Sequence, residues 1–528
     1  MINMSRSHIL TSLVAAVALS ALETRAASVP KLVVNITIDQ LRSDYMEAFM
    51  PLYGDKGFRR ILQEGRVYTQ AEYPVEKLDR SVAIASVVTG TIPYNHGIIS
   101  ECWLDRSTLR PVCCVDDNDY RGVETREMSS PKYLSVSTVS DELKVASEGK
   151  ALVYSIAPFR DAAILNAGHA ADGAVWLDDE DGVWCSTAYY GGLPSWALVR
   201  NQYHAIGKNL KKTVWEPSSD LVGNFSYFLS KGMKTPFQYK FNGDNNVVSF
   251  KTSGLINTEV CQLAENCLRS SMMGSDDIPD YLALTLYAGN FNHMPASEGP
   301  TELQDIYVRL DGAIAMLLEA VESKVGLNNA LFVLTSTGYS DQENFDLASY
   351  RIPTGNFDIQ RATSLLNMYL MAIYGQGQYV EACYGTDIYL NHKLIEEKQL
   401  NLVEVQNRSQ EFLIQMSGVK EVYTSHRLLL GSWTPQISRI RNSYNTKSSG
   451  DIYVQVSPGW RLINEVTKEN RLIRETYVPF PILFFGAGVL PERINTPVSV
   501  DRIAPTLAQT MRIRAPNACS SAPLSEFR

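Results

Sequence analysis

The sequence has little that would suit a membrane-spanning, repetitive or nucleic-acid-binding protein. After residue 27, no segment reaches the roughly eighteen uninterrupted apolar residues of a membrane-spanning helix. No internal repeat is visible, which argues against solenoids and propellers. There is no run of Lys or Arg, and 48 basic residues stand against 57 acidic ones, a net charge of −9. Because phosphate neutralisation supplies most of the affinity for nucleic acid, we expect no nucleic-acid partner.

The remaining composition is that of a globular protein. Of 528 residues, 45% are hydrophobic and 20% are charged, which excludes disordered, collagenous and coiled-coil classes. The length exceeds that of one compact core, so we expect several domains or one large domain with insertions.

The first 27 residues predict a secretory signal. Arg6 supplies the charged region, residues 9–22 the apolar stretch, and the small residues ending at Ala27 a cleavage site. We therefore expect an exported protein, periplasmic or secreted, without a transmembrane helix after the signal is removed.

All eight cysteines follow the predicted signal, so disulfides are possible in the exported chain. Cys102 with either Cys113 or Cys114, and Cys261 with Cys267, are the plausible local pairs, and buried free thiols are the alternative. The spacing does not fit a cysteine zinc site.

Apolar, β-branched runs alternate with helical patterns. Strands buried on both faces of a sheet are predicted at residues 32–38, 151–156, 281–287, 330–335 and 482–485. Helices are expected at residues 56–63, 81–88, 139–145, 303–321 and 500–511. This alternation predicts an α/β fold with a doubly wound, mostly parallel sheet flanked by helices, and chemistry beyond the carboxyl ends of the strands.

Two stretches interrupt the alternation and predict inserted substructures. The expected organisation is a core over residues 28–170, an inserted lobe over 171–255, more core over 256–345, a second insertion over 346–470, and a C-terminal core part over 471–528.

Several motifs resemble one known family. They are Asp39-Gln40, the Thr-Gly-x-x-Pro-x-x-His-Gly-Ile run at residues 89–98, the segment 167–173 and the ending 500–506. Together they resemble the alkaline phosphatase superfamily, in the branch of exported phosphate-irrepressible phosphatases related to nucleotide pyrophosphatases/phosphodiesterases. The resemblance implies two zinc ions held by three Asp and three His, with a Thr or Ser nucleophile.

The resemblance carries over only in part at the catalytic positions. Asp39 matches the first Asp ligand. The nucleophile position falls on Arg80, which cannot attack phosphorus, so the adjacent Ser81 is the candidate nucleophile. His293 matches a His ligand, while Asn290 stands where a carboxylate is expected.

Other family positions are also altered. The fourth strand end, residues 335–339, lacks an Asp and a His, and Pro479 replaces the last His. Glu101 replaces an asparagine that would contact phosphate. Of a basic pair that would do so, Arg160 remains, while Ala157 or Pro158 replaces the lysine. Arg80, Arg160 and Glu101 are thus the candidate phosphate contacts.

Three hypotheses follow. In the first, the two-zinc site is lost, no cofactor is bound, and the protein binds a protein or glycan partner in the cell envelope. Asp39 then either pairs with Arg80 or caps the helix that follows it. In the second, a divergent phosphomonoesterase or phosphodiesterase uses Ser81 and zinc, with Asp39, His293 and rescuing ligands such as Asp341 or Glu343. In the third, Arg80 and Arg160 bind a phosphoester without turnover.

Overall fold

A ten-stranded sheet forms the centre of the protein in the computed structural model, which describes residues 29–225, 236–341, 351–431, 434–465, 467–474 and 477–527. The predicted signal at residues 1–27 and the candidate ligand Glu343 lie outside the described residues. The strand order is β22-β2-β21-β13-β1-β12-β7-β8-β9-β6. In chain order these strands are β1 (Leu32–Asp39), β2 (Arg66–Tyr68), β6 (Gly122–Val123), β7 (Val153–Ala157), β8 (Gly173–Leu177), β9 (Trp184–Thr187), β12 (Asp280–Tyr287), β13 (Ala330–Ser336), β21 (Ile482–Gly486) and β22 (Glu492–Ile494).

The middle of this sheet is parallel. β13, β1, β12, β7 and β8 run in one direction, whereas β21 and β9 pair antiparallel at either side of them. The five predicted strands are all present in it, within one or two residues at each end. The doubly wound, mostly parallel fold is therefore confirmed.

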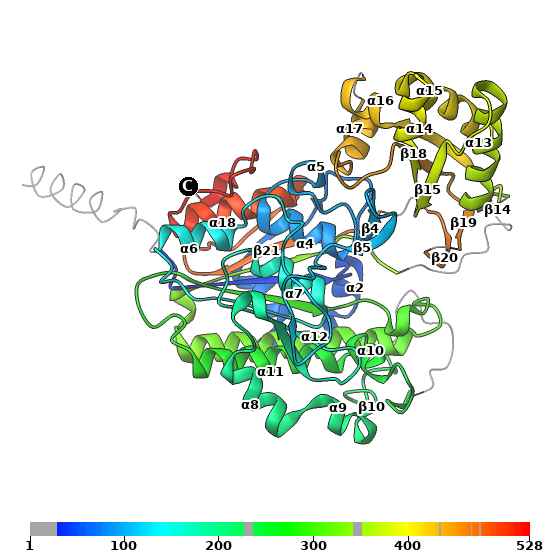
Figure 1. Cartoon of the computed structure of the whole chain (residues 1–528). Coiled ribbons are helices and arrows are strands. Elements are labelled where there is room, and N and C mark those ends of the chain that lie inside the picture. Colours follow the sequence, from blue (N-terminus) through cyan, green and yellow to red (C-terminus); the bar gives the residue numbers. More distant parts are fainter. Residues whose placement is uncertain are drawn as a thin grey trace, which may run out of the picture.

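Helices cover both faces of the sheet (Figure 1). α11 (Leu255–Ser270) and α12 (Pro300–Lys324) lie on one face, and α4 (Arg80–Thr89), α6 (Val139–Ala146), α7 (Arg160–Ala167) and α18 (Ile503–Met511) on the other. Side chains alternate along β1, so Val34 and Ile36 pack with the α11 and α12 cluster and Val33 packs with α4 and α18. Asp39 lies an even number of residues after Val33, so its side chain points to the same face of the sheet, toward α4.

The sheet extends into the region that the sequence assigns to a first insertion. β8 and β9, within residues 171–255, join its edge: β8 pairs parallel with β7 and β9 returns antiparallel. Both strands are completely buried. β8 is a short apolar run and β9 is half polar; β8 joins the core by pairing with β7, and β9 joins it by pairing with β8.

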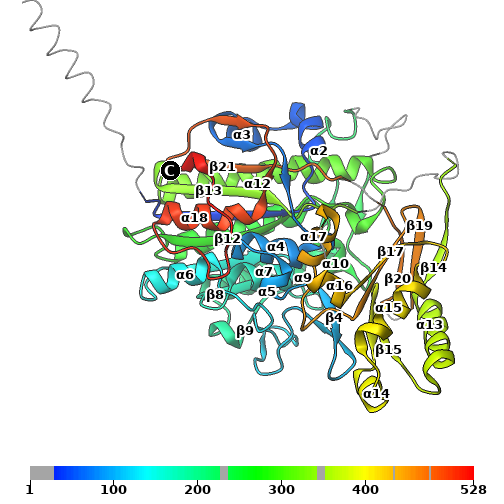
Figure 2. The ribbon, with the colours of Figure 1, turned by 90° about the horizontal axis from the view of Figure 1, so that it is seen from above.

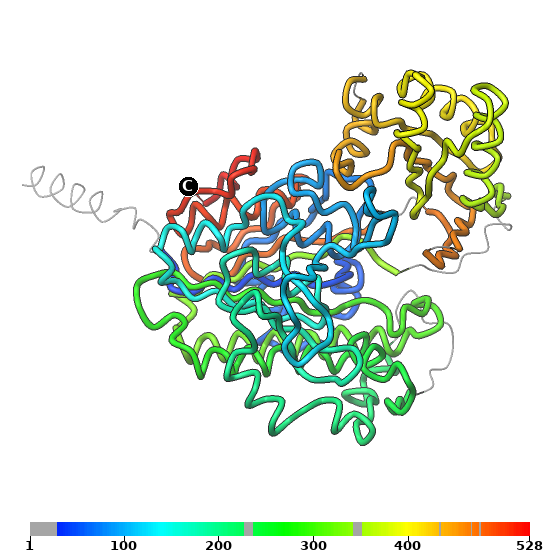
Figure 3. The backbone as a smooth tube through the Cα atoms, in the orientation of Figure 1, coloured from blue at the N-terminus to red at the C-terminus, as the bar shows by residue number. Residues whose placement is uncertain are grey.

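Residues 355–472 form a separate substructure beside the core (Figures 2 and 3). It holds a four-stranded sheet of β15 (Val380–Tyr384), β16 (Asp387–Leu390), β18 (Ile452–Val456) and β17 (Val419–Thr424), and a three-stranded sheet of β14 (Gly355–Asp358), β19 (Trp460–Asn464) and β20 (Glu469–Leu472). Helices α13 (Ile359–Tyr374), α14 (His392–Glu397) and α15 (Leu402–Leu413) accompany these sheets, and the substructure has its own apolar core.

A disulfide joins Cys102 and Cys113 across the hairpin of β4 (Cys102–Asp105) and β5 (Arg110–Cys113). One of the two pairings considered for Cys102 is thereby confirmed. The predicted pairing of Cys261 with Cys267 is wrong, since both are buried free thiols. They lie six residues apart on α11, a rise of about 9 Å, which is too far for a disulfide.

None of the helices in the described ranges has both the length and the apolar character needed to cross a bilayer.

Shortening one buried side chain of the central sheet tests how far the stability of the protein depends on this core. Leu334 in β13 is fully buried, so Leu334→Ala should lower the free energy of unfolding by about 2–5 kcal/mol, through lost burial and a residual cavity. Urea unfolding followed by circular dichroism measures the change. Leu490→Ala, at a side chain 69% exposed, is the matched control and should change stability by less than about 0.5 kcal/mol. Equal losses in the two variants would contradict the assignment of this core.

Candidate functional site

The guanidinium of Arg80 is the centre of the site. Arg80 is the first residue of α4, which Asp79 caps by accepting a hydrogen bond from the Val82 backbone N–H at 2.9 Å. Its Nε and Nη2 donate to the carboxylate of Asp161 at 2.9–3.1 Å. Its Nη1 lies 3.5 Å from Asp39 and its Nη2 lies 3.8 Å from Glu101. The guanidinium of Arg80 therefore interacts with three carboxylates at once.

Asp39 ends β1 and is buried against this guanidinium. Burial raises the pKa of its carboxyl, while the charge of Arg80 and hydrogen bonds from Tyr339 and Thr337 oppose that rise. The Thr337 hydroxyl donates to Oδ1 of Asp39 at 2.9 Å. Of the two structural roles considered for Asp39, the ion pair with Arg80 is present, whereas its side chain does not cap the helix that follows.

Asp161 is the residue that the sequence analysis missed. It lies in the first turn of α7, and its carboxylate accepts hydrogen bonds from Arg80 and, at 2.7 Å, from the Ser81 hydroxyl. Burial alone would raise the pKa of Asp161, but the charge of Arg80 and these hydrogen bonds outweigh it and lower the pKa. The available signal was a carboxylate in the first turn of the helix after the second predicted strand, close to where ligands bind in such sheets.

Ser81, the candidate nucleophile, is fully buried. Besides donating to Asp161, its hydroxyl oxygen lies 3.4 Å from the thiol of Cys114, which donates to it. The side chain is thus held within the protein between α4, α7 and the segment after β5. Its catalytic role stays a prediction.

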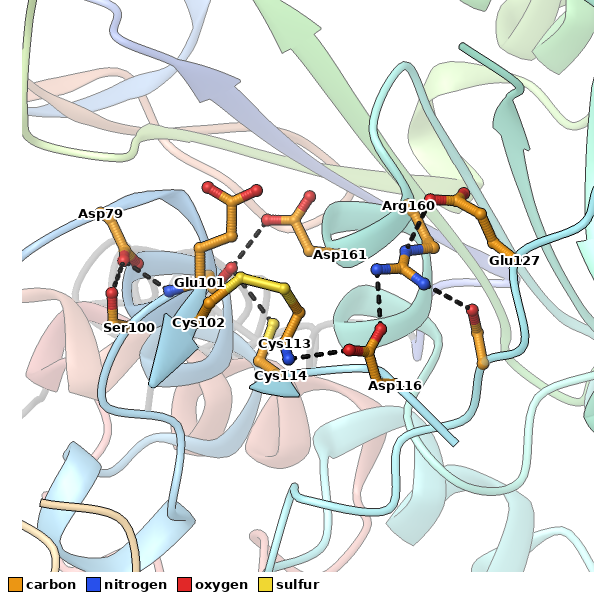
Figure 4. Close-up of a disulfide and its surroundings, with 12 residues drawn as sticks. Asp79, Ser100, Glu101, Cys102, Cys113, Cys114, Asp116, Glu127, Arg160 and Asp161 are labelled. Carbon is orange, nitrogen blue, oxygen red and sulfur yellow. Dashed lines mark hydrogen bonds and ion pairs between the residues drawn. A yellow bond between two sulfur atoms is a disulfide. The ribbon is translucent and has the colours of Figure 1, made fainter. Parts of the chain in front are cut away.

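Glu101 stands at the mouth of the site, just before β4 (Figure 4). Its backbone N–H donates to Asp79 at 2.7 Å, and its side chain is 61% exposed. Repulsion by Asp161 and then burial raise the pKa of Glu101 to about 7, against the lowering effect of Arg80.

Arg160, the other candidate phosphate contact, is engaged elsewhere. Its guanidinium lies 2.9 Å from Asp116 and 3.5 Å from Glu127, and it donates to the Ser129 hydroxyl at 3.2 Å (Figure 4). Two carboxylates thus already neutralise the cation that would meet a phosphate.

His293 and Asp341 form a second group at a neighbouring strand end. The Nδ1 atom of His293 lies 3.0 Å from Oδ1 of Asp341. The backbone N–H of Asn290 donates to the same carboxylate at 3.1 Å, and the Gln40 side-chain amide donates to it at 3.3 Å. Of the rescuing ligands considered, Asp341 is therefore close to His293.

The donors present do not fit a two-zinc centre. Across the part of the chain that the structure describes, no three His, Cys, Asp or Glu side chains gather as a metal site requires. The cation of Arg80 lies 3.5 Å from the one matched carboxylate, Asp39. At such a distance a metal ion would meet a repulsion of about 4 kcal/mol per unit charge at an effective dielectric of 20.

Similarity to known proteins agrees with this architecture. A profile of the type I phosphodiesterase / nucleotide pyrophosphatase family matches residues 33–478, and the chain belongs to this family. It is 28% identical over 532 residues to alkaline phosphatase PafA of Elizabethkingia meningoseptica, with 96% of each chain covered. It is 26% identical to alkaline phosphatase PhoV of Synechococcus elongatus, covering 92% of this chain and 91% of that one. The crystal structure of wild-type PafA superposes with a TM-score of 0.82 at 26% identity, covering 95% of this chain and 99% of that one. The resemblance to the alkaline phosphatase superfamily is thus confirmed.

Removing the central cation should destabilise the fold. Arg80→Met leaves two buried carboxylates, Asp39 and Asp161, without their shared partner, and we expect a loss of about 3–5 kcal/mol in urea unfolding. Arg126→Met, at a side chain 91% exposed, should change stability by less than about 1 kcal/mol. If Arg80→Met were as stable as Arg126→Met, the central role of Arg80 would be refuted.

The raised pKa of Glu101 predicts that substituting this residue changes the melting temperature by an amount that depends on pH. A carboxyl whose pKa is higher in the folded protein adds stability below its unfolded pKa near 4.5, and this contribution is lost as the pH rises through about 7. Glu101→Gln cannot ionise, so its melting temperature should exceed that of the wild type more at about pH 8 than at about pH 4. Glu319→Gln, on the exposed side of α12, is the control and should show no such trend.

Proposed function

We propose that this chain is an exported, phosphatase-like binding protein that does not hydrolyse phosphoesters by two-zinc catalysis. The single observation that carries the proposal is the position of Arg80, whose guanidinium is bonded to Asp161 and paired with Asp39 at the strand end. The side chain of Arg80 thus supplies the positive charge that Asp39 and Asp161 face at this strand end.

The flanking residues support the same proposal. Glu101 places a carboxylate at the entrance, where a phosphate dianion would have to enter. The side chains of Arg80 and Arg160 are both engaged by carboxylates, which also weakens the hypothesis of phosphoester binding by this pair.

The second candidate function is hydrolysis of phosphoesters with Ser81 as nucleophile. The comparisons favour it over the first, since the relatives named above are alkaline phosphatases. The hydrogen bond from Ser81 to Asp161 also pairs a hydroxyl with a potential base. Against it stand the complete burial of Ser81 and the lowered pKa of Asp161, which makes this carboxylate a weak base.

Metal stoichiometry separates the two functions. The mature protein is exposed to excess zinc, desalted and measured by mass spectrometry, with aryl phosphate hydrolysis assayed on the same sample. We expect less than about 0.1 zinc per chain and no zinc-dependent turnover, because fewer than three ligands do not hold zinc tightly. Zinc near two per chain with hydrolysis would overturn the proposal. Loss of that hydrolysis in Ser81→Ala, with an unchanged melting temperature, would then assign the nucleophile.

A further inference from the structure

The helix α8 (Ser195–His204) and the turns that follow it form an outer layer of the protein. α8 packs against α11, which itself covers one face of the central sheet, so α8 lies outside the helix layer (Figure 1). Its inner side carries the buried Trp196 and Ala197. The short helix α9 (Ile206–Asn209) and a turn over Leu210–Lys212 continue the chain along the same edge. The outer side of these elements is therefore open to a partner.

Large apolar side chains gather on the outer side of α8. Val199 is 52% exposed and Tyr203 is 68% exposed, and their four-residue spacing places them on one face of the helix. Leu198 is exposed beside them, and the exposed Met272, in the loop after α11, borders the same hollow as Trp196 at the start of α8. Single exposed apolar side chains are common, whereas a group of them marks a contact surface. We call Leu198, Val199, Tyr203 and Met272 the apolar ridge.

Four exposed lysines lie just beyond the C-terminal end of α8. Three of them are closely spaced along the chain, and the fourth is brought to them by the pairing of β11 (Tyr239–Lys240) with β10 (Val214–Trp215). They are Lys208, Lys211, Lys212 and Lys240, and we call them the basic end. Among the residues that the structure describes, the Nζ atoms of these four lysines have no hydrogen-bond or ion-pair partner. Their ammonium groups are therefore available to an anionic partner.

The segment that carries most of these side chains is free of acidic residues. Residues 182–215 include no Asp or Glu, although the chain has 57 acidic residues and a net charge of −9. Asp181 and Glu216 border the segment, and Asp220 and Asp244 follow it. Positive side chains are thus concentrated on one edge of an acidic protein, which is the charge pattern that steers an anionic surface toward that edge.

The apolar ridge and the basic end adjoin each other, since Lys208 is the fifth residue after Tyr203. Lysines alone would suit any polyanion, and apolar side chains alone would suit a protein partner. The two together match the surface of an anionic bilayer, where apolar side chains enter the headgroup region and lysines contact lipid phosphates. Tyr203 fits this region as well, because its ring is apolar and its hydroxyl is polar. A nucleic acid would use the lysines but leave the apolar ridge without a contact.

We propose that this edge docks the exported protein onto a bilayer that contains anionic phospholipid. The apolar ridge enters the headgroup region, and the basic end contacts the lipid phosphates. Figure 1 shows α8 and α9 at the opposite end of the view from the substructure of residues 355–472, so this docking leaves that substructure directed away from the bilayer. The inference goes beyond the proposed function and is independent of any turnover at Ser81.

Co-sedimentation with lipid vesicles tests this docking. The mature protein is mixed with vesicles of phosphatidylcholine, alone or with about 40% phosphatidylglycerol, at about 0.1 M salt, where the Debye length is about 10 Å. We expect the partition coefficient to be at least about tenfold higher with phosphatidylglycerol, because the lysines gain contacts with anionic headgroups. Raising the salt concentration should lower it, because these contacts are screened.

A triple variant tests the role of the basic end. Its substitutions are Lys208→Gln, Lys211→Gln and Lys212→Gln. We expect the partition coefficient to fall by about tenfold or more, since each lysine near an anionic surface adds to the affinity. The control makes the same change of net charge at exposed lysines elsewhere on the surface, namely Lys56→Gln, Lys150→Gln and Lys393→Gln. Its partition coefficient should stay within about twofold of the wild type, because charges beyond the Debye length contribute little.

A double variant tests the role of the apolar ridge. Val199→Ser combined with Tyr203→Ser should lower the partition coefficient by about threefold or more, because binding to the interface scales with the apolar area that enters it. Thermal melting followed by circular dichroism checks that every variant is folded.

Three results would overturn the proposal. They are equal partitioning onto the two kinds of vesicle, an equal loss in the basic-end variant and its control, and binding to poly-glutamate as tight as to the vesicles with no effect of the double variant. Hydrolysis of aryl phosphate plays no part in these measurements, so failure of this inference and failure of the proposed function are distinguishable.

Discussion

The ion pairs of Arg80 are the interaction on which the strand-end arrangement depends. A positive side chain at the first residue of a helix opposes the helix dipole, and its burial costs solvation energy. Asp161 meets this cost with a bidentate pair at 2.9–3.1 Å, and Asp39 adds a second charge at 3.5 Å. The same guanidinium lies over the ring of Phe159, 3.9 Å from its centroid. β1, α4 and α7 are thereby fixed relative to one another at one point.

The central fold was predictable because its strands are continuous apolar runs. The run at residues 32–38 becomes β1 and the run at 281–287 becomes β12, with burial along their whole lengths. β9 escaped prediction as a core strand because Ser186 and Thr187 break its apolar pattern, whereas β8 is a short apolar run that the expected boundary at residue 171 assigned to the insertion. β8 takes its place in the sheet by pairing with β7 and β9 by pairing with β8, and no local pattern encodes these contacts between segments.

The candidate site was predictable only where a motif marks it. Asp39 and Arg80 occupy motif positions, so their pairing could be expected. Asp161 lies in a short helix with no motif of its own, and its importance arises from the packing of α4 against α7. The partnership of His293 with Asp341 likewise depends on a loop 48 residues away in the sequence. Long-range geometry, which the sequence pattern does not carry, decides these contacts.

Glu101 connects the strand-end network to the β4–β5 hairpin. Asp79 caps α4 through one carboxylate oxygen and holds the backbone of Glu101 through the other, at 2.9 and 2.7 Å. The Cys102–Cys113 disulfide fixes the hairpin that follows. The position of the Glu101 carboxylate is therefore set by the same helix start that carries Arg80. The resemblance implies an asparagine at position 101 and a Thr or Ser at position 80. Glutamate at position 101 adds one negative charge and arginine at position 80 adds one positive charge, so the two differences balance. Both residues belong to one network, in which the guanidinium of Arg80 faces the carboxylates of Asp39, Asp161 and Glu101.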